Sequence, residues 1–228
     1  MKILWISVLC SFILCPVRDL HAQKDLQRPK ETLDSVLLTK LDAMKKVDQY
    51  YAGQPQGKYQ GDWENWYKAR DSISRLHIKV LDSILDRRGY PGFDLVGKQG
   101  SLSFWLIAQH ADWNPDFQQK VLLLLKEEVD KGNANAQNYG YLVDRVRINT
   151  NRPQVYGTQL DYNEKGQAFP KNLENPKNVN KRRAELGMEV LEIYLNSVTK
   201  AHFKRNRAYL VKQGIMAPVL YEVPKDKY

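Results

Sequence analysis

The chain of 228 residues has only two cysteines, Cys10 and Cys15, and both lie within its first 22 residues. Residues 23–228 therefore contain none, which excludes disulfides, thiol nucleophiles and cysteine-bound zinc from that part of the chain. Histidine is scarce as well, because only His77, His110 and His202 occur after residue 22. We therefore expect no histidine-rich metal site, and we predict no metal and no cofactor.

Several motifs of common enzyme classes are also missing. The chain has no P-loop, no G-x-G-x-x-G fingerprint, no G-x-S-x-G elbow and no H-E-x-x-H pair. Nor does it have an apolar run of the roughly 20 residues that a membrane-spanning helix needs. The longest such run, Ile3 to Cys15, is too short.

That apolar run has the features of an export signal. Lys2 supplies a positive start, and Leu20 and Ala22 occupy the −3 and −1 positions of a plausible cleavage site. We predict a signal peptide over residues 1–22, cleavage near Ala22, and a periplasmic or secreted protein without a transmembrane segment. A retained anchor or lipidation at Cys15 are the alternatives.

The charge balance is basic, with a formal net charge of +9, and cleavage after Ala22 lowers it by one unit. Seven lysines and arginines lie between residues 200 and 228, against Glu222 and Asp226. Basic surfaces favour anionic partners, of which nucleic acid is unlikely for an exported protein. The simplest interpretation is a basic surface without a specific partner. The alternative is weak contact of this basic tail with an anionic envelope surface.

Helical periodicity runs through most of the chain and predicts an all-α fold of about six helices in one domain, residues 23–228. Asp62 and Asn114 are expected to be N-caps, with Pro115 at a first helical position and Gly89 after a helix end. Residues 149–178 have little periodicity and predict one long irregular loop, of a kind that is often functional. The expected helices are 31–51, 62–88, 98–111, 115–131, 134–148 and 179–203.

The segment "FWLIAQHADWNPDFQ", residues 104–118, joins a very apolar helix to polar side chains. Trp105, Gln109 and Asp112 fall within one narrow arc of the helix. His110 and Asp112 are separated by about 200° and face opposite ways as long as the helix continues. "HAD" is therefore not a His–Asp pair by itself. His77, on an apolar helix face, is expected to be a core residue with one ring nitrogen satisfied by a hydrogen bond.

A second polar group follows in "YLVDRVRINTNRPQVYGTQL". Asp144 could orient a catalytic histidine, and Arg145 and Arg152 could hold an anion through paired hydrogen bonds. The loop supplies uncharged donors and acceptors: Gln154, Tyr156, Thr158 and Gln159. The alternative is an ordered loop pinned to the helices by an ion pair between Asp144 and an arginine.

Five motifs occur in order: "GYPGFDLVG", "FWLIAQHADWNPDFQ", "YLVDRV", "RPQVYGTQ" and "NPKNVNKRRAELGM". Together they resemble a bacterial family catalogued only as a domain of unknown function, over residues 63–195. The resemblance implies no mechanism. It implies that the polar residues of these motifs form one functional neighbourhood: Gln109, His110, Asp112, Asp144, Arg145, Gln154, Tyr156 and Gln159.

Three hypotheses follow. In the first, the chain is an enzyme of hydrolase or transferase type acting on a small polar or anionic substrate. His110 is then the general acid or base, oriented by Asp112 or Asp144. The remaining site residues would bind the substrate: Trp105, Gln109, Arg145, Arg152, Gln154, Tyr156, Thr158 and Gln159. In the second, it is a non-catalytic envelope module that binds an acidic glycan, lipid or protein. In the third, the polar motifs form a purely structural network.

Overall fold

The computed structural model describes residues 33–225, so the predicted signal peptide lies outside the described residues. Within them the fold is mainly helical, as predicted, with eight α-helices rather than about six. They are α1 (Ser35–Ala52), α2 (Trp63–Arg88), α3 (Phe93–Gln109), α4 (Pro115–Asp130), α5 (Ala136–Asn149), α6 (Val179–Glu185), α7 (Leu191–Arg205) and α8 (Arg207–Lys212). The sequence predicts one long irregular loop between α5 and α6, and the structure corrects this, because the segment holds an antiparallel hairpin of β1 (Leu160–Tyr162) and β2 (Ala168–Pro170). Two short 3-10 turns complete the set, η1 (Gly57–Tyr59) and η2 (Pro176–Asn178).

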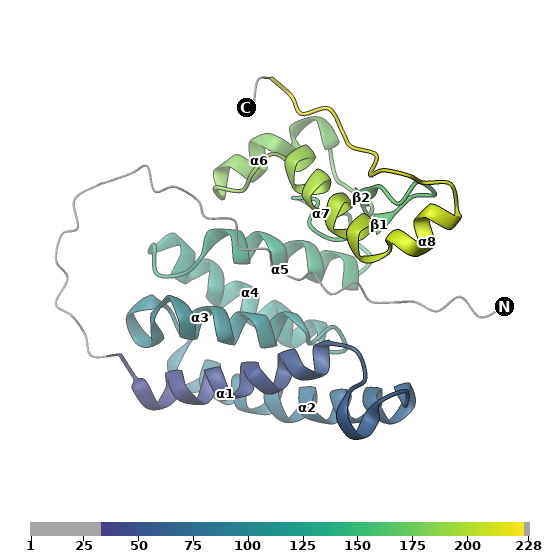
Figure 1. Ribbon diagram of the computed structural model, residues 1–228. Helices are drawn as coiled ribbons and strands as arrows, with labels where there is room; N and C mark the ends of the chain where they lie inside the picture. Colours follow the sequence, from purple (N-terminus) through teal and green to yellow (C-terminus); the bar gives the residue numbers. More distant parts are fainter. Residues whose placement is uncertain (1–32, 226–228) are drawn as a thin grey trace.

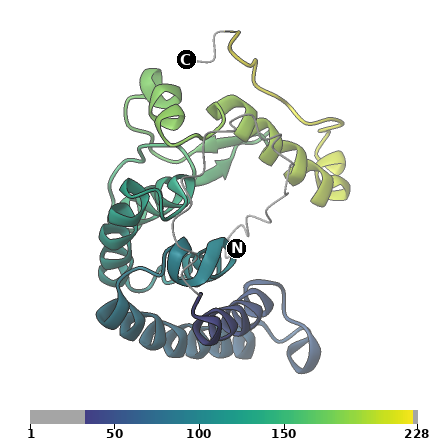
Figure 2. The same ribbon diagram turned by 90° about the vertical axis from the view of Figure 1, so that its left-hand side faces the viewer.

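The elements follow the chain from one end of the molecule to the other. Helices α1 and α2 lie at one end, α3, α4 and α5 come next, and the hairpin with α6, α7 and α8 forms the other end (Figure 1). The view turned by 90° shows that this succession is curved, so that the molecule has the outline of an arc (Figure 2). No helix in residues 33–225 has the length and apolarity needed to cross a membrane.

The predicted helix ends are confirmed where a polar side chain fixes them. Asp62 is the N-cap of α2 and accepts a hydrogen bond from the Asn65 amide at 3.1 Å. Asn114 is the N-cap of α4, directly before Pro115, and accepts a hydrogen bond from the Phe117 amide at 3.1 Å. Gly89 follows α2 with a φ of 69°, a backbone conformation that glycine adopts without strain. Local capping chemistry therefore sets these boundaries.

The structure extends one helix prediction and corrects another. Helix α3 includes a first turn from Phe93, and after a kink at Gly97 (φ 67°, ψ 175°) its regular part begins at Lys98, as predicted. The single helix expected over 179–203 is two helices, α6 and α7, separated at Gly187 (φ 65°). Side chains hold this break, since Arg183 donates to the Glu189 carbonyl and Asn180 accepts from the Leu191 amide.

Apolar side chains form two clusters. The larger joins α1 to α5 and contains fully buried residues from every one of these helices, among them Leu41, Leu81, Phe104, Val121 and Leu142. The smaller joins β2, α6 and α7: Ala168, Val179, Leu191, Tyr194 and Leu195. Tyr141 of α5 packs against both clusters, so α5 connects the two parts of the molecule.

Candidate functional site

His110 lies directly after the last residue of α3 and contacts α1. Its Nδ1 is 2.8 Å from Oδ2 of Asp48, a carboxylate whose side chain is only 10% exposed. Carboxylate oxygens accept hydrogen bonds, so Nδ1 of the neutral ring carries the proton and Nε2 keeps its lone pair. The His110 side chain is 29% exposed, and no described residue is hydrogen-bonded to Nε2. An oriented imidazole with an available nitrogen is the arrangement that proton transfer requires.

His77 of α2 lies near the same carboxylate. It is buried, as predicted, but the expected hydrogen bond is missing at its Nδ1, which has no partner among the described residues. Burial lowers the pKa of His77 below the ordinary 6.5, while the negative charge of Asp48 acts in the opposite direction. Asp48 therefore interacts with two imidazoles, that of partly exposed His110 and that of buried His77.

The lowered pKa of His77 predicts a loss of stability in mild acid. The unfolded chain binds a proton at this residue more readily than the folded chain, so the free energy of unfolding falls as pH drops below about 6.5. We therefore compare the free energies of unfolding of His77→Leu and of the unsubstituted protein. The difference in favour of His77→Leu should be larger at pH 5 than at pH 7. Urea unfolding of both proteins at the two pH values measures this change. A stability difference that is the same at both values would contradict it.

Asp112 lies on the other side of the end of α3 and contacts α5. Its carboxylate accepts from Nη1 of Arg145 at 3.0 Å and from Nδ2 of Asn149 at 2.9 Å. The same arginine nitrogen donates to the backbone carbonyl of Gln109 at 3.0 Å. His110 and Asp112 thus point to different helices, even though α3 ends before both. Asp112 is bonded to Arg145, not to His110.

Asp144 of α5 is fully buried and bonded to the loop that follows the helix. Its Oδ1 accepts from the amides of Val155 and Tyr156 at 2.7 and 3.0 Å. Its Oδ2 accepts from the amide and the hydroxyl of Thr158 at 2.8 and 2.9 Å. Burial raises the pKa of this carboxyl group, and these hydrogen bonds act in the opposite direction. Asp144 fixes the loop through backbone amides and the Thr158 hydroxyl, and not through the ion pair with an arginine that was the alternative.

Gln154 completes the fixation of this loop. Its side chain is fully buried, donates to the carbonyls of Gln159 (2.8 Å) and Lys171, and accepts from the Gln159 amide at 2.7 Å. Arg183, which is 1% exposed, donates to the Tyr156 carbonyl at 2.7 Å from α6. The irregular loop is therefore held by buried side chains on both of its flanks.

The remaining predicted substrate residues lie in different surroundings. Trp105 is fully buried and donates from Nε1 to the Asn138 carbonyl at 2.9 Å. Exposed Arg152 donates to the Thr150 hydroxyl at 3.0 Å, and Gln159 donates to the Thr158 hydroxyl at 3.2 Å. Burial raises the pKa of half-buried Tyr156 to about 12. A substrate-binding role for these residues stays a prediction.

The predicted polar neighbourhood is therefore divided among three places. His110 pairs with α1, and Asp144 with the Gln154 group holds the loop. Between α3 and α5, Arg145 binds the Asp112 side chain and the Gln109 backbone carbonyl. The expectation that Asp112 or Asp144 orients His110 is corrected, because Asp48 makes that contact. Sequence reasoning missed Asp48, although a sign of it exists. Asp48 follows Leu41 and Met44 at helical spacing, on the buried stripe of α1. A carboxylate at such a position needs a partner.

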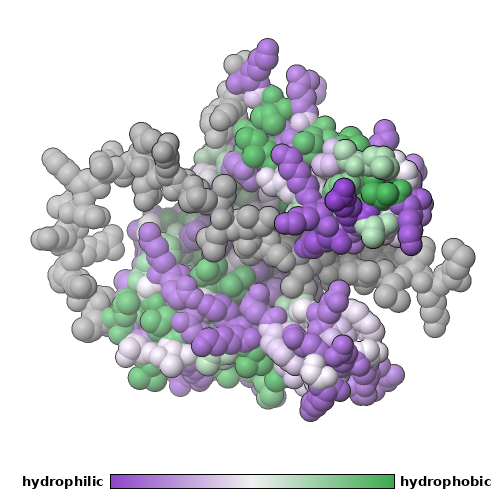
Figure 3. Space-filling view, viewed as in Figure 1, coloured by the Kyte–Doolittle hydropathy of each residue, from purple (hydrophilic) through white to green (hydrophobic). Residues whose placement is uncertain are grey.

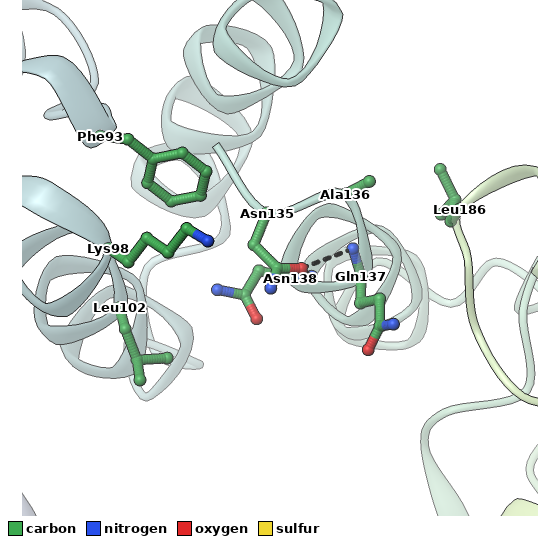
Figure 4. Close-up of a pocket in the computed structure, with 8 residues that line it drawn as sticks. All are labelled: Phe93, Lys98, Leu102, Asn135, Ala136, Gln137, Asn138 and Leu186. Carbon is green, nitrogen blue, oxygen red and sulfur yellow. Dashed lines mark hydrogen bonds between the residues drawn. The ribbon is translucent and has the colours of Figure 1, made fainter. Parts of the chain in front are cut away.

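A hollow of about 410 Å³ lies at the opposite end of α3 (Figure 4). Phe93, Lys98 and Leu102 of α3 form one side, and the start of α5 with Asn135 and Asn138 forms the other. Leu102, the lining residue of α3 nearest to His110 in the sequence, precedes it by eight residues, which corresponds to about 12 Å along a helix. This hollow is therefore separate from the Asp48–His110 pair. In residues 33–225 no three His, Asp or Glu side chains are grouped closely enough to hold a metal ion.

Comparison with known proteins identifies one family. The model of a family of unknown function (DUF6624) matches residues 38–205, which extends beyond the 63–195 region of the five motifs and includes Asp48. No curated protein and no solved structure matches the chain.

Proposed function

The chain belongs to the DUF6624 family of unknown function, and we propose that it is an enzyme of the hydrolase or transferase type. In this proposal His110 is the general acid or base, and the substrate is small and polar or anionic. The observation that carries the proposal is the contact between Asp48 and His110, which leaves Nε2 of a partly exposed ring available. Asp48 takes the orienting role that the sequence suggested for Asp112 or Asp144.

The proposed chemistry uses the two nitrogens of His110 differently. Nδ1 donates to Asp48, which fixes the tautomer and the angle of the ring. Nε2 then accepts a proton from a water molecule or a hydroxyl group as it attacks, and returns it to the leaving group. Asp48 acts through His110 and is a positioning residue.

Screening for hydrolysis tests the proposal without knowledge of the natural substrate. A panel of chromogenic carboxylic esters, phosphate esters, glycosides and anilides is incubated with the purified protein, with His110→Gln and with His202→Gln. His202 is a matched control because it stacks on Tyr162 at a centroid distance of 3.7 Å, apart from Asp48. We expect activity on one substrate class that His110→Gln loses and His202→Gln keeps. Activity that both variants keep would reject His110 as the catalytic group.

We infer a structural role for Asp144 and Gln154. Both side chains are fully buried, and their hydrogen bonds end on the loop itself. This corresponds to the hypothesis of a purely structural network, restricted to the second motif group. The two groups of motifs then have different purposes, chemistry near His110 and loop fixation near Asp144.

We propose that the protein acts after export, in the periplasm or the medium. The pattern of Lys2, the apolar run and Ala22 supports this proposal. Expressed with its full N-terminus in a bacterial host, the protein should be recovered from the exported fraction with Gln23 as its first residue. Intact-mass measurement determines that end, and Ala22→Arg should block processing. A mature chain that still contains Lys2, or a lipidated Cys15, would contradict the proposal.

A further inference from the structure

The C-terminal segment from α8 to residue 223 carries an unusual number of exposed apolar side chains. Tyr209 is 65% exposed and Met216 is 72% exposed. Four more large hydrophobic residues of the segment are also exposed: Val211, Val219, Leu220 and Val223. Soluble surfaces rarely concentrate large apolar side chains in this way without a partner.

Helix α8 is held to the rest of the protein by very few of its own side chains. Of its six residues only Leu210 is buried. Figure 1 places α8 at the outer edge of the molecule, beside the end of α7. The exposed side chains of this helix are therefore presented at an edge of the fold and are not turned toward its core.

Cations accompany the apolar side chains. Lys204, Arg207 and Lys212 are exposed, and within residues 33–225 none of them has a carboxylate within 4 Å. Figure 3 shows strongly hydrophilic and hydrophobic side chains next to one another in the region of α8, at the upper right of the view. Their positive charge requires an anionic partner if it is to be neutralised.

We propose that one segment of the protein docks onto an anionic lipid surface. The segment runs from Lys204, at the end of α7, through α8 to Val223. Lys204, Arg207 and Lys212 lie at the level of the lipid phosphates, while Tyr209 and Met216 enter the boundary between headgroups and acyl chains. Nucleic acid or an acidic glycan would satisfy the cations but would leave the aliphatic side chains in water. A lipid surface accounts for both observations.

Vesicle binding tests the charge contribution. Sedimentation with vesicles of 70% phosphatidylcholine and 30% phosphatidylglycerol is compared for the full mature chain and for Lys204→Gln/Arg207→Gln/Lys212→Gln. Each cation near such a surface changes the partition coefficient about fivefold, so the triple variant should bind roughly 100-fold more weakly. Lys40→Gln/Lys46→Gln/Lys79→Gln is the matched control, because these exposed lysines lie on α1 and α2 and the net charge is the same. The control should bind as the unsubstituted protein does.

The apolar contribution is tested in salt. Tyr209→Ser/Met216→Ser should weaken vesicle binding roughly tenfold at 0.5 M salt, where charge attraction is screened. Thermal melts of all variants should be unchanged, because the substituted side chains are exposed. The proposal is overturned if the protein binds pure phosphatidylcholine vesicles as strongly as the mixed vesicles, or if both triple variants lose the same amount of binding. It is also overturned if the protein is retained on a nucleic acid or heparin column but does not bind vesicles.

Discussion

Replacing His110 with glutamine should lower kcat on the substrate class found by screening by roughly 10³-fold, the loss expected when a general acid or base is removed. Glutamine is polar and of similar size, so the partly exposed position after α3 is filled while the titrating nitrogen is lost. Steady-state kinetics of the variant and the unsubstituted protein measure the change. KM should alter little, since the proposal assigns His110 to proton transfer and not to binding.

Asp48→Asn provides the companion measurement for this prediction. The amide keeps the shape of the side chain but no longer fixes the proton on Nδ1 of His110, so kcat should fall by roughly 10²-fold with KM retained. His202→Gln should keep the full rate. If Asp48→Asn is as active as the unsubstituted protein while His110→Gln is inactive, the orienting role of Asp48 is wrong. If neither substitution affects activity, the whole site is wrong.

Replacing Asp144 with alanine should lower the free energy of unfolding by about 4 kcal/mol, because several buried donors lose their acceptor together. The carboxylate accepts from three backbone amides and one hydroxyl, all in the loop after α5. Those groups would remain enclosed, since Asp144 itself is fully buried. Urea unfolding followed by circular dichroism measures the change.

Two variants serve as controls for the Asp144 prediction. Thr158→Val removes only the hydroxyl donor and should cost about 1 kcal/mol. Asp161→Ala changes an exposed aspartate of β1 and should stay within about 0.5 kcal/mol. A loss for Asp144→Ala no greater than that for Asp161→Ala would show that the loop does not depend on its buried carboxylate.

Helix positions could be predicted wherever a local signal determines them. Asp62, Asn114 with Pro115, and Gly89 each act through their own backbone or side-chain chemistry within a few residues. The apolar periodicity of α1 to α5 therefore sufficed to locate these helices and to predict a helical fold.

The break between α6 and α7 could not be predicted from local patterns. Arg183 is held there by carbonyls of Glu189 and Tyr156, and the second of these belongs to the distant loop. An arginine in a basic run such as "NKRRAE" suggests a solvent-exposed face, yet this one is 1% exposed. Tertiary hydrogen bonds decide its position, and these depend on how the loop folds.

The sequence predicts His110 as the candidate histidine, but it does not predict the residue that contacts it. The polar end of an apolar helix indicated His110, and helical geometry indicated that Asp112 would not pair with it. The partner comes from α1, 62 residues earlier in the sequence. Such a contact depends on the packing of α1 against α3, which periodicity alone does not specify.

The tautomer of His110 tests the central claim most directly, because it reports the Asp48 contact without requiring a substrate. A long-range ¹⁵N–¹H correlation spectrum of the histidine side chains at neutral pH identifies which ring nitrogen carries the proton. We expect the neutral ring of His110 to be protonated at Nδ1, with Nε2 free, and Asp48→Asn to remove this preference. A His110 ring protonated at Nε2, and unchanged in Asp48→Asn, would contradict the account.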